Sequence, residues 1–282
     1  MKKYLFAFVF AFLSMHSFGQ EADTSWKKGG LVNINFNQVS LNQWAQGGEN
    51  SLSLASSLGL FANYVKDNST WSNSLDLSYA LLKSGAQNLR KSDDRIDLTS
   101  KWGRKFTDKW YYSALFNFKS QFADGFNYPN DSNIVSKFLA PGYLTLALGV
   151  NYKPVSYFEL FLSPATVRLT IVNDQLLADA GAYGVTPGKK SRSEFGAYLN
   201  MIFKKDVMEN VTLSTKLELF NNYTDKDENN RKNVDINWEL ALNLKVNKLI
   251  NASLVTQLIY DDNVIQRTQF KEVIGVGLGY KF

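Results

Sequence analysis

Histidine and cysteine, the side chains behind most hydrolytic catalysis and transition-metal binding, are almost missing from this chain. The sequence contains no cysteine, and its single histidine, His16, lies near the N-terminus. Beyond His16 the chain has no thiol nucleophile, no imidazole base and neither of the best transition-metal ligands. Hydrolases that pair a histidine with serine or aspartate are therefore excluded. We predict no enzyme activity, no catalytic residue, no cofactor and no metal.

Acidic and basic side chains remain as candidates for chemistry. Carboxylates at neighbouring positions could act as an acid and a base. Because lysines occur on the same faces of the same segments, a charge-balanced and hydrogen-bonded wall around a lumen is the better interpretation. The predicted lumen-lining residues are Asp76, Asp97, Lys101, Lys119, Lys216, Glu218, Asp235, Glu239 and Lys245.

Two further stretches resemble ligand-binding loops but lack essential positions. In GAYGVTPGKKS, Tyr183 stands where a phosphate-binding loop needs its first glycine, and Lys190 replaces the hydroxyl residue. The segment Asp225–Asn229 begins like a calcium loop, but Asn230 replaces the glycine and Ile236 the final glutamate. We predict solvated surface loops in both places, with adventitious divalent binding as the lesser alternative for the second.

The N-terminus has the form of an export signal. Lys2 and Lys3 precede an apolar run, Tyr4–Leu13, which is followed by small residues up to Gln20. Such a run is too short to cross a bilayer as a helix, so we predict a signal peptide over residues 1–19. Its removal lowers the net charge from +5 to about +3, and this small, scattered excess predicts no nucleic-acid partner.

The mature chain shows recurring alternation of apolar and polar residues, the period of a β-strand. In one segment the parity changes at Pro164, as a β-bulge would produce. Short connections alternate with longer polar ones, which include residues 83–93, 173–190 and 261–269. The twelve segments are 31–41, 51–64, 71–81, 96–102, 110–119, 144–152, 158–171, 195–203, 211–219, 234–246, 250–260 and 270–282.

Two arrangements fit this alternation: a soluble barrel or sandwich with the apolar face inward, and a membrane barrel with that face toward lipid. The segments are long enough to cross the hydrocarbon when tilted, and export removes the protein from the cytosol. We therefore predict an all-β fold: a transmembrane antiparallel up-and-down β-barrel of about 12 strands over residues 31–282, after a short periplasmic segment, residues 20–30. Aromatic residues near the segment ends match interfacial girdles: Tyr64, Trp71, Trp102, Trp110, Tyr112, Tyr152, Tyr260 and Tyr280.

The chain ends VIGVGLGYKF, in the middle of the alternation. A last strand that closes on the first leaves no backbone edge in lipid, so it can stop where the membrane stops. Tyr280 and Phe282 also resemble the C-terminal signal by which the bacterial assembly machinery recognises outer-membrane proteins. The predicted location is the bacterial outer membrane, with lipid, lipopolysaccharide and that machinery as partners.

The first long connection reads LNQWAQGGENSLSL. Trp44, Gly47, Gly48, Glu49 and Asn50 resemble the NWxxGGxN signature of a family of Bacteroidota outer-membrane proteins known as DUF3078, with Gln43 in place of the usual asparagine. The stretch from Asp174 to Gly188 is similar to that family as well, and the resemblance is expected to cover nearly the whole mature chain. The family carries no assigned activity, so the resemblance implies compartment and fold.

Two functions fit the predicted barrel. A polar inner face predicts a narrow or gated channel for small solutes, which inward-folded loops such as Asn173–Lys190 could occlude. The alternative is a non-catalytic structural or accessory subunit that docks with envelope protein partners through its loops. The aromatic loop residues Phe126, Tyr128 and Tyr183 support this alternative.

Overall fold

The computed structural model describes residues 25–41, 49–225, 228 and 230–282. The predicted signal peptide and three residues of the family motif, Trp44, Gly47 and Gly48, lie outside the described residues. No helix in the described part of the chain is long and apolar enough to cross a membrane.

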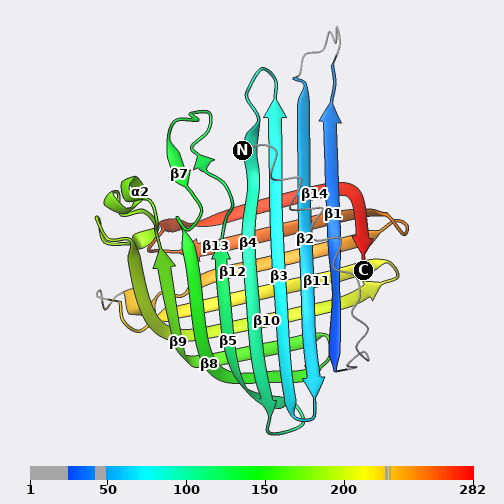
Figure 1. The fold of residues 1–282 in the computed structure, drawn as a ribbon, viewed down its shortest axis with the longest axis vertical. Coiled ribbons are helices and arrows are strands. Elements are labelled where there is room, and N and C mark those ends of the chain that lie inside the picture. Colours follow the sequence, from blue (N-terminus) through cyan, green and yellow to red (C-terminus); the bar gives the residue numbers. More distant parts are fainter. Residues whose placement is uncertain (1–24, 42–48, 226–227, 229) are drawn as a thin grey trace, which may run out of the picture.

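Twelve antiparallel strands close into one barrel (Figure 1), which confirms the predicted fold class and strand number. Each strand pairs with its neighbours along the chain, and the last strand pairs with the first. Two short strands, β6 (Gly125–Phe126) and β7 (Ile134–Ser136), form a separate sheet in one loop. The barrel strands are β1 (Trp26–Val39), β2 (Ser51–Lys66), β3 (Ser69–Ser84), β4 (Arg90–Lys105), β5 (Trp110–Ser120), β8 (Gly142–Val155), β9 (Phe158–Ile171), β10 (Ser191–Met208), β11 (Val211–Asn222), β12 (Asp235–Lys245), β13 (Ile250–Asp261) and β14 (Ile265–Lys281).

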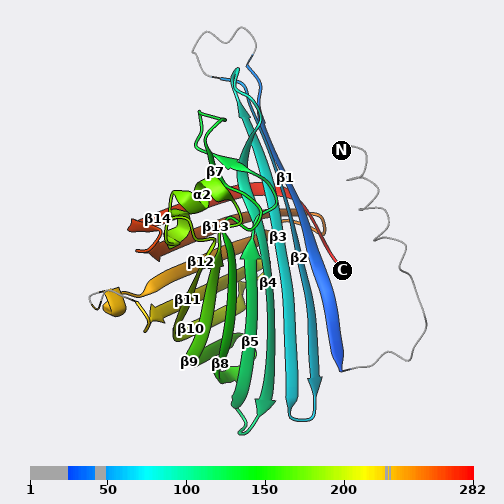
Figure 2. The ribbon, with the colours of Figure 1, turned by 60° about the vertical axis from the view of Figure 1, so that its left-hand side comes forward.

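Short turns gather at one end of the barrel and long connections at the other, which we call the short-turn end and the long-loop end. The chain terminates at the short-turn end, where the backbone of Phe282 pairs with Gly30. The long-loop end carries the helix α2 (Gln175–Asp179) and the 3₁₀ turns η1 (Ala182–Gly184) and η2 (Asn230–Lys232). In Figure 2 strands β1–β5 run steeply while β10–β14 cross behind them, as tilted strands on opposite walls of a barrel must.

Several strands are longer than the alternation predicts. β1 begins at Trp26 instead of Leu31, so residues 26–30 belong to the barrel and not to a periplasmic segment. β4 begins at Arg90 and β14 at Ile265, which reduces the predicted long connections 83–93 and 261–269 to tight turns. The physical reason is that backbone pairing continues through polar residues beyond the apolar band, where side-chain alternation gives no signal.

The predicted bulge in β9 is confirmed. Ala165 pairs with Leu148 and Leu162 with Val150, so the register slips across Pro164. Gly149 lies opposite the bulge, and a Cβ atom there would overlap the carbonyl oxygen of Leu162 and lie 2.8 Å from the Cα atom of Ser163. The bulge therefore requires a glycine on the facing strand.

Gly149→Ala is expected to destabilise the barrel by about 1–3 kcal/mol, because backbone and not a flexible side chain occupies the space of the new methyl group. Urea unfolding in lipid vesicles, followed by tryptophan fluorescence, measures the change. Ala147→Gly, which removes a methyl group on the same strand, is the control for general sensitivity of β8. An unchanged unfolding midpoint for Gly149→Ala would show that the bulge relaxes.

The outer surface of the barrel is apolar and the inner surface polar. Leu148 on β8 points outward and is 64% exposed, whereas Asp97 on β4 and Glu218 on β11 point inward and are 2% and 7% exposed. Aromatic rings cluster at the short-turn end, where Trp26 contacts Tyr64 with ring centroids 5.2 Å apart. This is the distribution of a transmembrane barrel, and it is the reverse of a soluble one.

Candidate functional site

Part of the lumen is packed with side chains. The inward-facing residues of β4, β5 and β8–β11 are largely buried, and five of them form an apolar cluster inside the barrel. This apolar cluster departs from the polar inner face that the alternation predicts. Its members are Leu115, Ala147, Phe161, Tyr198 and Phe220.

An ion-pair network crosses the lumen between β4–β5 and β11–β12. Lys119 on β5 contacts Glu218 on β11 at 2.5 Å, and Arg95 on β4 contacts Glu239 on β12 at 2.9 Å. Arg95 also pairs with Asp97 at 2.8 Å. These strands are not neighbours in the barrel, so the contacts hold opposite walls together. We call this set the cross-lumen network: Arg95, Asp97, Lys119, Lys216, Glu218 and Glu239.

Neutral groups complete the cross-lumen network. The side-chain amides of Asn117 and Asn237 donate to Asp97 at 2.7 Å and to Glu218 at 2.8 Å, and the hydroxyl group of Tyr198 donates to the other oxygen of Glu218 at 2.8 Å. Three cations thus face three carboxylates, and amide and hydroxyl donors satisfy remaining oxygens. Such pairing is what allows charges to be buried.

Two further ion-pair groups lie on the same side of the barrel. At the short-turn end, Lys101 and Lys153 both contact Glu159. Toward the long-loop end, Arg168 forms a two-pronged pair with Glu194, at 2.9 and 3.1 Å, and reaches Asp235 at 2.5 Å. Together with the cross-lumen network, these groups occupy much of the lumen beside β4, β5 and β8–β11.

The opposite side of the lumen is more open, and an ion pair between Lys271 on β14 and Asp93 on β4 spans it. The inward-facing residues of β1–β3, β13 and β14 are mostly partly or fully exposed. Many of these residues are asparagine, serine or glycine, and Asn251 donates to Asn33 at 3.0 Å across Gly279. We call this side the open wall; it includes Asn33, Asn35, Ser53, Ser57, Gly59, Ser74, Ser78, Asn251, Ser253, Gly275, Gly277 and Gly279.

Most predicted lumen-lining residues take part in these arrangements. Asp97, Lys119, Lys216, Glu218 and Glu239 belong to the cross-lumen network. Lys101 pairs with Glu159 and Asp235 with Arg168, whereas Asp76 is exposed beside the open wall. Lys245 is exposed at the short-turn end and forms no ion pair with any residue that the structure describes.

Several members of these groups were missed by the sequence analysis. Arg95, Glu159, Arg168, Glu194 and Tyr198 share the inward parity of their strands, which is the signal that could have identified them. Arg95 precedes the predicted fourth segment, and Arg168 follows the parity change at Pro164. The partners across the lumen follow from the shape of the closed barrel, and no local pattern specifies that shape.

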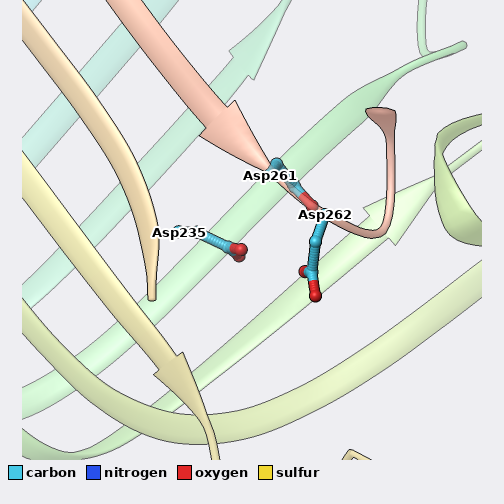
Figure 3. A group of neighbouring side chains, drawn as sticks. All are labelled: Asp235, Asp261 and Asp262. Atoms are coloured by element: carbon cyan, nitrogen blue, oxygen red, sulfur yellow. The ribbon is translucent and has the colours of Figure 1, made fainter. Parts of the chain in front are cut away.

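Three carboxylates meet at the long-loop end (Figure 3). One oxygen each of Asp235, Asp261 and Asp262 lies within 4.8 Å of the others. Arg168 already pairs with Asp235, and the side-chain amide of Asn233 donates to Asp262 at 2.6 Å. A divalent cation would have to compete with these donors, so we assign no metal here.

The predicted surface loop between β9 and β10 is packed instead of flexible. Leu177 and Val185 from this loop bury against Ala140 of the preceding long loop and Val172. The hydroxyl group of Tyr183 donates to the carbonyl group of Val135 at 2.7 Å, and burial raises the pKa of Tyr183 to about 12. The apolar residues of this stretch could have indicated in the sequence that the loop is packed.

Asp174 fixes the start of α2. Its side chain accepts from the backbone N–H of Leu177 at 3.1 Å and pairs with Lys137 at 2.7 Å. The hydrogen bond from Lys137 is the main reason why the pKa of Asp174 lies below its ordinary value. Because the folded-state pKa is lowered, the stabilisation is present above the ordinary pKa and is lost as the pH falls through the folded-state value.

Asp174→Ala is expected to loosen the loop, since loss of such a cap costs about 0.5–2 kcal/mol. Trypsin cleavage after Lys189 and Lys190 should become faster, as measured by mass spectrometry of the intact barrel. Asp179→Ala, at the other end of α2, is the matched control and should leave the rate nearly unchanged. Equal rates for both variants would contradict a capping role for Asp174.

Two described residues of the family motif anchor the first long loop. The side chain of Asn50 accepts from the backbone N–H of Leu41 at 2.5 Å, and Glu49 accepts from the hydroxyl group of Ser84 at 3.2 Å. At the other end of the chain, the rings of Tyr280 and Phe282 stack with centroids 6.1 Å apart. Their role as an assembly signal stays a prediction.

Comparisons with known proteins give a match to one family model. The family model described as "Protein of unknown function (DUF3078)" matches residues 36–126, which confirms the predicted resemblance over that region; for Asp174–Gly188 it stays a prediction. No curated protein matches the chain.

Among solved structures, 72 chains match. An outer membrane channel from Pseudomonas putida F1 is 12% identical with a TM-score of 0.42, covering 93% of this chain and 99% of that chain. The NanC porin is 9% identical with a TM-score of 0.40, covering 88% and 98%. Outer membrane phospholipase A from Escherichia coli is 13% identical with a TM-score of 0.40, covering 92% and 94%. These likenesses are distant, and the strand pairing itself defines the barrel.

Proposed function

We propose that this barrel lies in the bacterial outer membrane, surrounded by lipid and lipopolysaccharide, and conducts small polar solutes along the open wall of its lumen. The observation that carries the proposal is the division of the inner surface: one side is packed and ion-paired, the other partly exposed and lined by asparagine, serine and glycine. The proposed role includes no enzyme activity, no cofactor and no nucleic acid.

The chemistry of the open wall favours uncharged or weakly charged solutes. Amide and hydroxyl groups offer both donors and acceptors that replace the hydration of a passing polar molecule. The fixed charges on this side include the exposed carboxylate of Asp76 and the ion pair between Lys271 and Asp93, whose opposite charges offset each other. The cross-lumen network limits the width of the passage, because its ion pairs join opposite walls.

Conductance in planar bilayers tests the proposal. Purified protein is expected to give small single-channel steps, and Ser57→Trp is expected to reduce them, because Ser57 faces the lumen beside Asn33. Ser56→Trp is the matched control: Ser56 is the next residue on β2 and lies on the outward face. A folded barrel without steps, or equal steps in both variants, would contradict conduction along the open wall.

A structural role in an envelope complex is the second candidate, favoured by apolar residues on the packed loops. Leu176 on α2 and Phe138 in the preceding long loop are both exposed. The two loops that carry them pack against each other through a buried apolar cluster. Leu176→Asp combined with Phe138→Asp should abolish co-purification of an envelope protein while conductance persists. Recovery of the barrel alone from mildly solubilised wild-type membranes would count against this role.

A further inference from the structure

Lysine side chains line the lumen where it opens at the short-turn end. The alternation along the strands sets their direction, because each follows or precedes an outward-facing residue. Lys27 follows Trp26, whose ring packs in the outer aromatic girdle, and Lys281 follows Tyr280, which is 62% exposed on the outer surface. The inward-facing lysines near this end are Lys27, Lys105, Lys153, Lys204, Lys245 and Lys281.

These lysines differ in whether a carboxylate neutralises them. On the packed side of the lumen, Lys105 pairs with Asp108 at 3.2 Å and Lys153 with Glu159 at 3.3 Å. The other inward-facing lysines are exposed and form no ion pair with any residue that the structure describes. Of these, Lys204 lies on β10 beside the packed half, and the remaining three lie on β12, β14 and β1.

The lysines on β12, β14 and β1 surround the end of the open wall. We call them the lysine mouth: Lys245, Lys281 and Lys27. Two of them flank the seam, which is the pairing of β14 with β1 that closes the barrel. Their partners on the neighbouring strands are Asn251 for Lys245, Leu31 for Lys281 and Asn63 for Lys27. A solute on the open wall therefore enters or leaves the lumen beside three ammonium groups.

The acids at this end lie away from the lysine mouth or are already engaged. Asp108 pairs with Lys105, and Asp206 accepts a hydrogen bond from the hydroxyl group of Thr212 at 2.6 Å. Asp67 and Glu209 are exposed in turns. Within the described part of the chain, neither these carboxylates nor the C-terminal carboxylate forms an ion pair with the mouth.

The charges deeper along the open wall do not cancel the positive charge of the mouth. Lys271 and Asp93 pair with each other. Asp76 lies opposite Gly59, Gly59 opposite Leu31 and Leu31 opposite Lys281. Asp76 is thus three strands from Lys281, about 14 Å along the sheet at the usual strand spacing. The short-turn end of the open wall is therefore a region of net positive charge.

This charge has a consequence for which solutes enter. A cleft lined by charges of one sign concentrates ions of the opposite sign, and lysine side chains around a pore favour anions. Beyond the mouth, the amide and hydroxyl groups of the open wall can replace the hydration of hydroxyl groups. A small molecule with an anionic group and several hydroxyl groups matches both parts of the path.

We propose that the lysine mouth attracts small, hydroxyl-rich organic anions and selects them for passage along the open wall. The anionic group lies among the ammonium groups of Lys27, Lys245 and Lys281, and the hydroxyl groups meet the asparagine and serine side chains of the wall. This inference rests on the proposed conduction along the open wall and adds the charge class of the solute.

Reversal potentials in planar bilayers test the selection. The salt is N-methylglucamine gluconate, whose cation and anion are open-chain polyols of similar size, and it is applied as a concentration gradient. The wild-type channel is expected to favour gluconate. The combined variant Lys27→Gln, Lys245→Gln and Lys281→Gln should lower the ratio of gluconate to N-methylglucamine permeability at least about threefold, the effect of losing a nearby unit charge in water.

A matched control removes the same charge from the outer surface at the same end. Lys28, Lys66 and Lys205 face outward; Lys28 lies 5.6 Å from the ring centroid of Trp26, and Lys205 lies 4.7 Å from that of Tyr157. None of the three is ion-paired to a described residue. The combined variant Lys28→Gln, Lys66→Gln and Lys205→Gln should keep the wild-type preference for gluconate.

A second readout needs no current. Asn63→Cys places a thiol opposite Lys27. Its reaction rate with an anionic sulfonatoethyl methanethiosulfonate is divided by its rate with the cationic trimethylammonioethyl reagent, and this ratio is compared with that of free 2-mercaptoethanol. The ratio at Asn63→Cys should exceed that of the free thiol. It should fall at least about threefold when the mouth lysines are replaced, and not when the outer lysines are replaced.

The two proposals fail separately. A conducting barrel that favours N-methylglucamine or neither ion, or that loses its preference equally in both lysine variants, would overturn the selection while leaving the channel. A barrel without current would contradict the channel, and the thiol ratio alone then decides whether the mouth attracts anions. A ratio at Asn63→Cys no higher than that of the free thiol would overturn the lysine mouth.

Discussion

Glu218→Gln is expected to destabilise the barrel by about 3–5 kcal/mol, the usual cost of breaking a buried ion pair from one side. Glu218 is 7% exposed and lies 2.5 Å from Lys119 and 3.3 Å from Lys216. The variant keeps the shape of the side chain but leaves both ammonium groups without this carboxylate. Lys216 would retain only Asp97, 3.6 Å away.

The unfolding midpoint in urea, with the protein in lipid vesicles, measures this effect. Glu209→Gln is the matched control, because Glu209 is an exposed acid in the turn between β10 and β11 and has no ion pair with any described residue. Its midpoint should stay within experimental error of wild type. Similar midpoints for the two variants would mean that the cross-lumen network contributes no more than surface charges do.

Gly277→Val is expected to prevent closure of the barrel. A Cβ atom on Gly277 would overlap the carbonyl oxygen of Ile34 and lie 2.8 Å from the Cα atom of Asn35, so the partner strand itself blocks the side chain. The seam is confined to Leu31–Asn35 and the Gly30–Phe282 pair, and Gly277 pairs with its last residue. Few other contacts between β1 and β14 remain to compensate.

Electrophoresis without heating separates folded from unfolded barrels and gives the measurement. Gly277→Val should migrate as unfolded protein, whereas Gly59→Ala should migrate as wild type. Gly59 is an inward-facing glycine whose nearest obstacle is the side chain of Asp76 at 3.2 Å, which can move. A compact, heat-sensitive band for Gly277→Val would show that the seam is not needed in the form described.

The strand number and the orientation of the faces were predictable because they depend on local periodicity. The parity change at Pro164 even located the bulge opposite Gly149. The extent of β14 was not predictable, since its first residues, Ile265–Gln269, join β13 through a register shift and show no alternation of apolar and polar side chains. Backbone hydrogen bonds determine where such strands begin, and these bonds place few demands on the amino-acid sequence.

The inside of the barrel was only partly predictable. The alternation identified Asp97 and Glu218 as inward-facing, but not that Arg95 reaches Glu239 across the lumen, which depends on how the sheet closes. The alternation also did not show which way Leu115 points, because β5 carries apolar residues on both faces. Leu115 points inward and belongs to the packed cluster. Which half of the lumen is filled therefore depends on tertiary packing.

Labelling of single cysteines tests the central claim, that the apolar side faces lipid and the lumen is open along one wall only. The chain has no native cysteine, so each introduced thiol is unique. In lipid vesicles, a small water-soluble maleimide should modify Ser253→Cys on the open wall. It should not modify Leu148→Cys on the outer surface or Ser113→Cys in the packed half. Rapid modification of Leu148→Cys, or equal modification of Ser113→Cys and Ser253→Cys, would contradict the account.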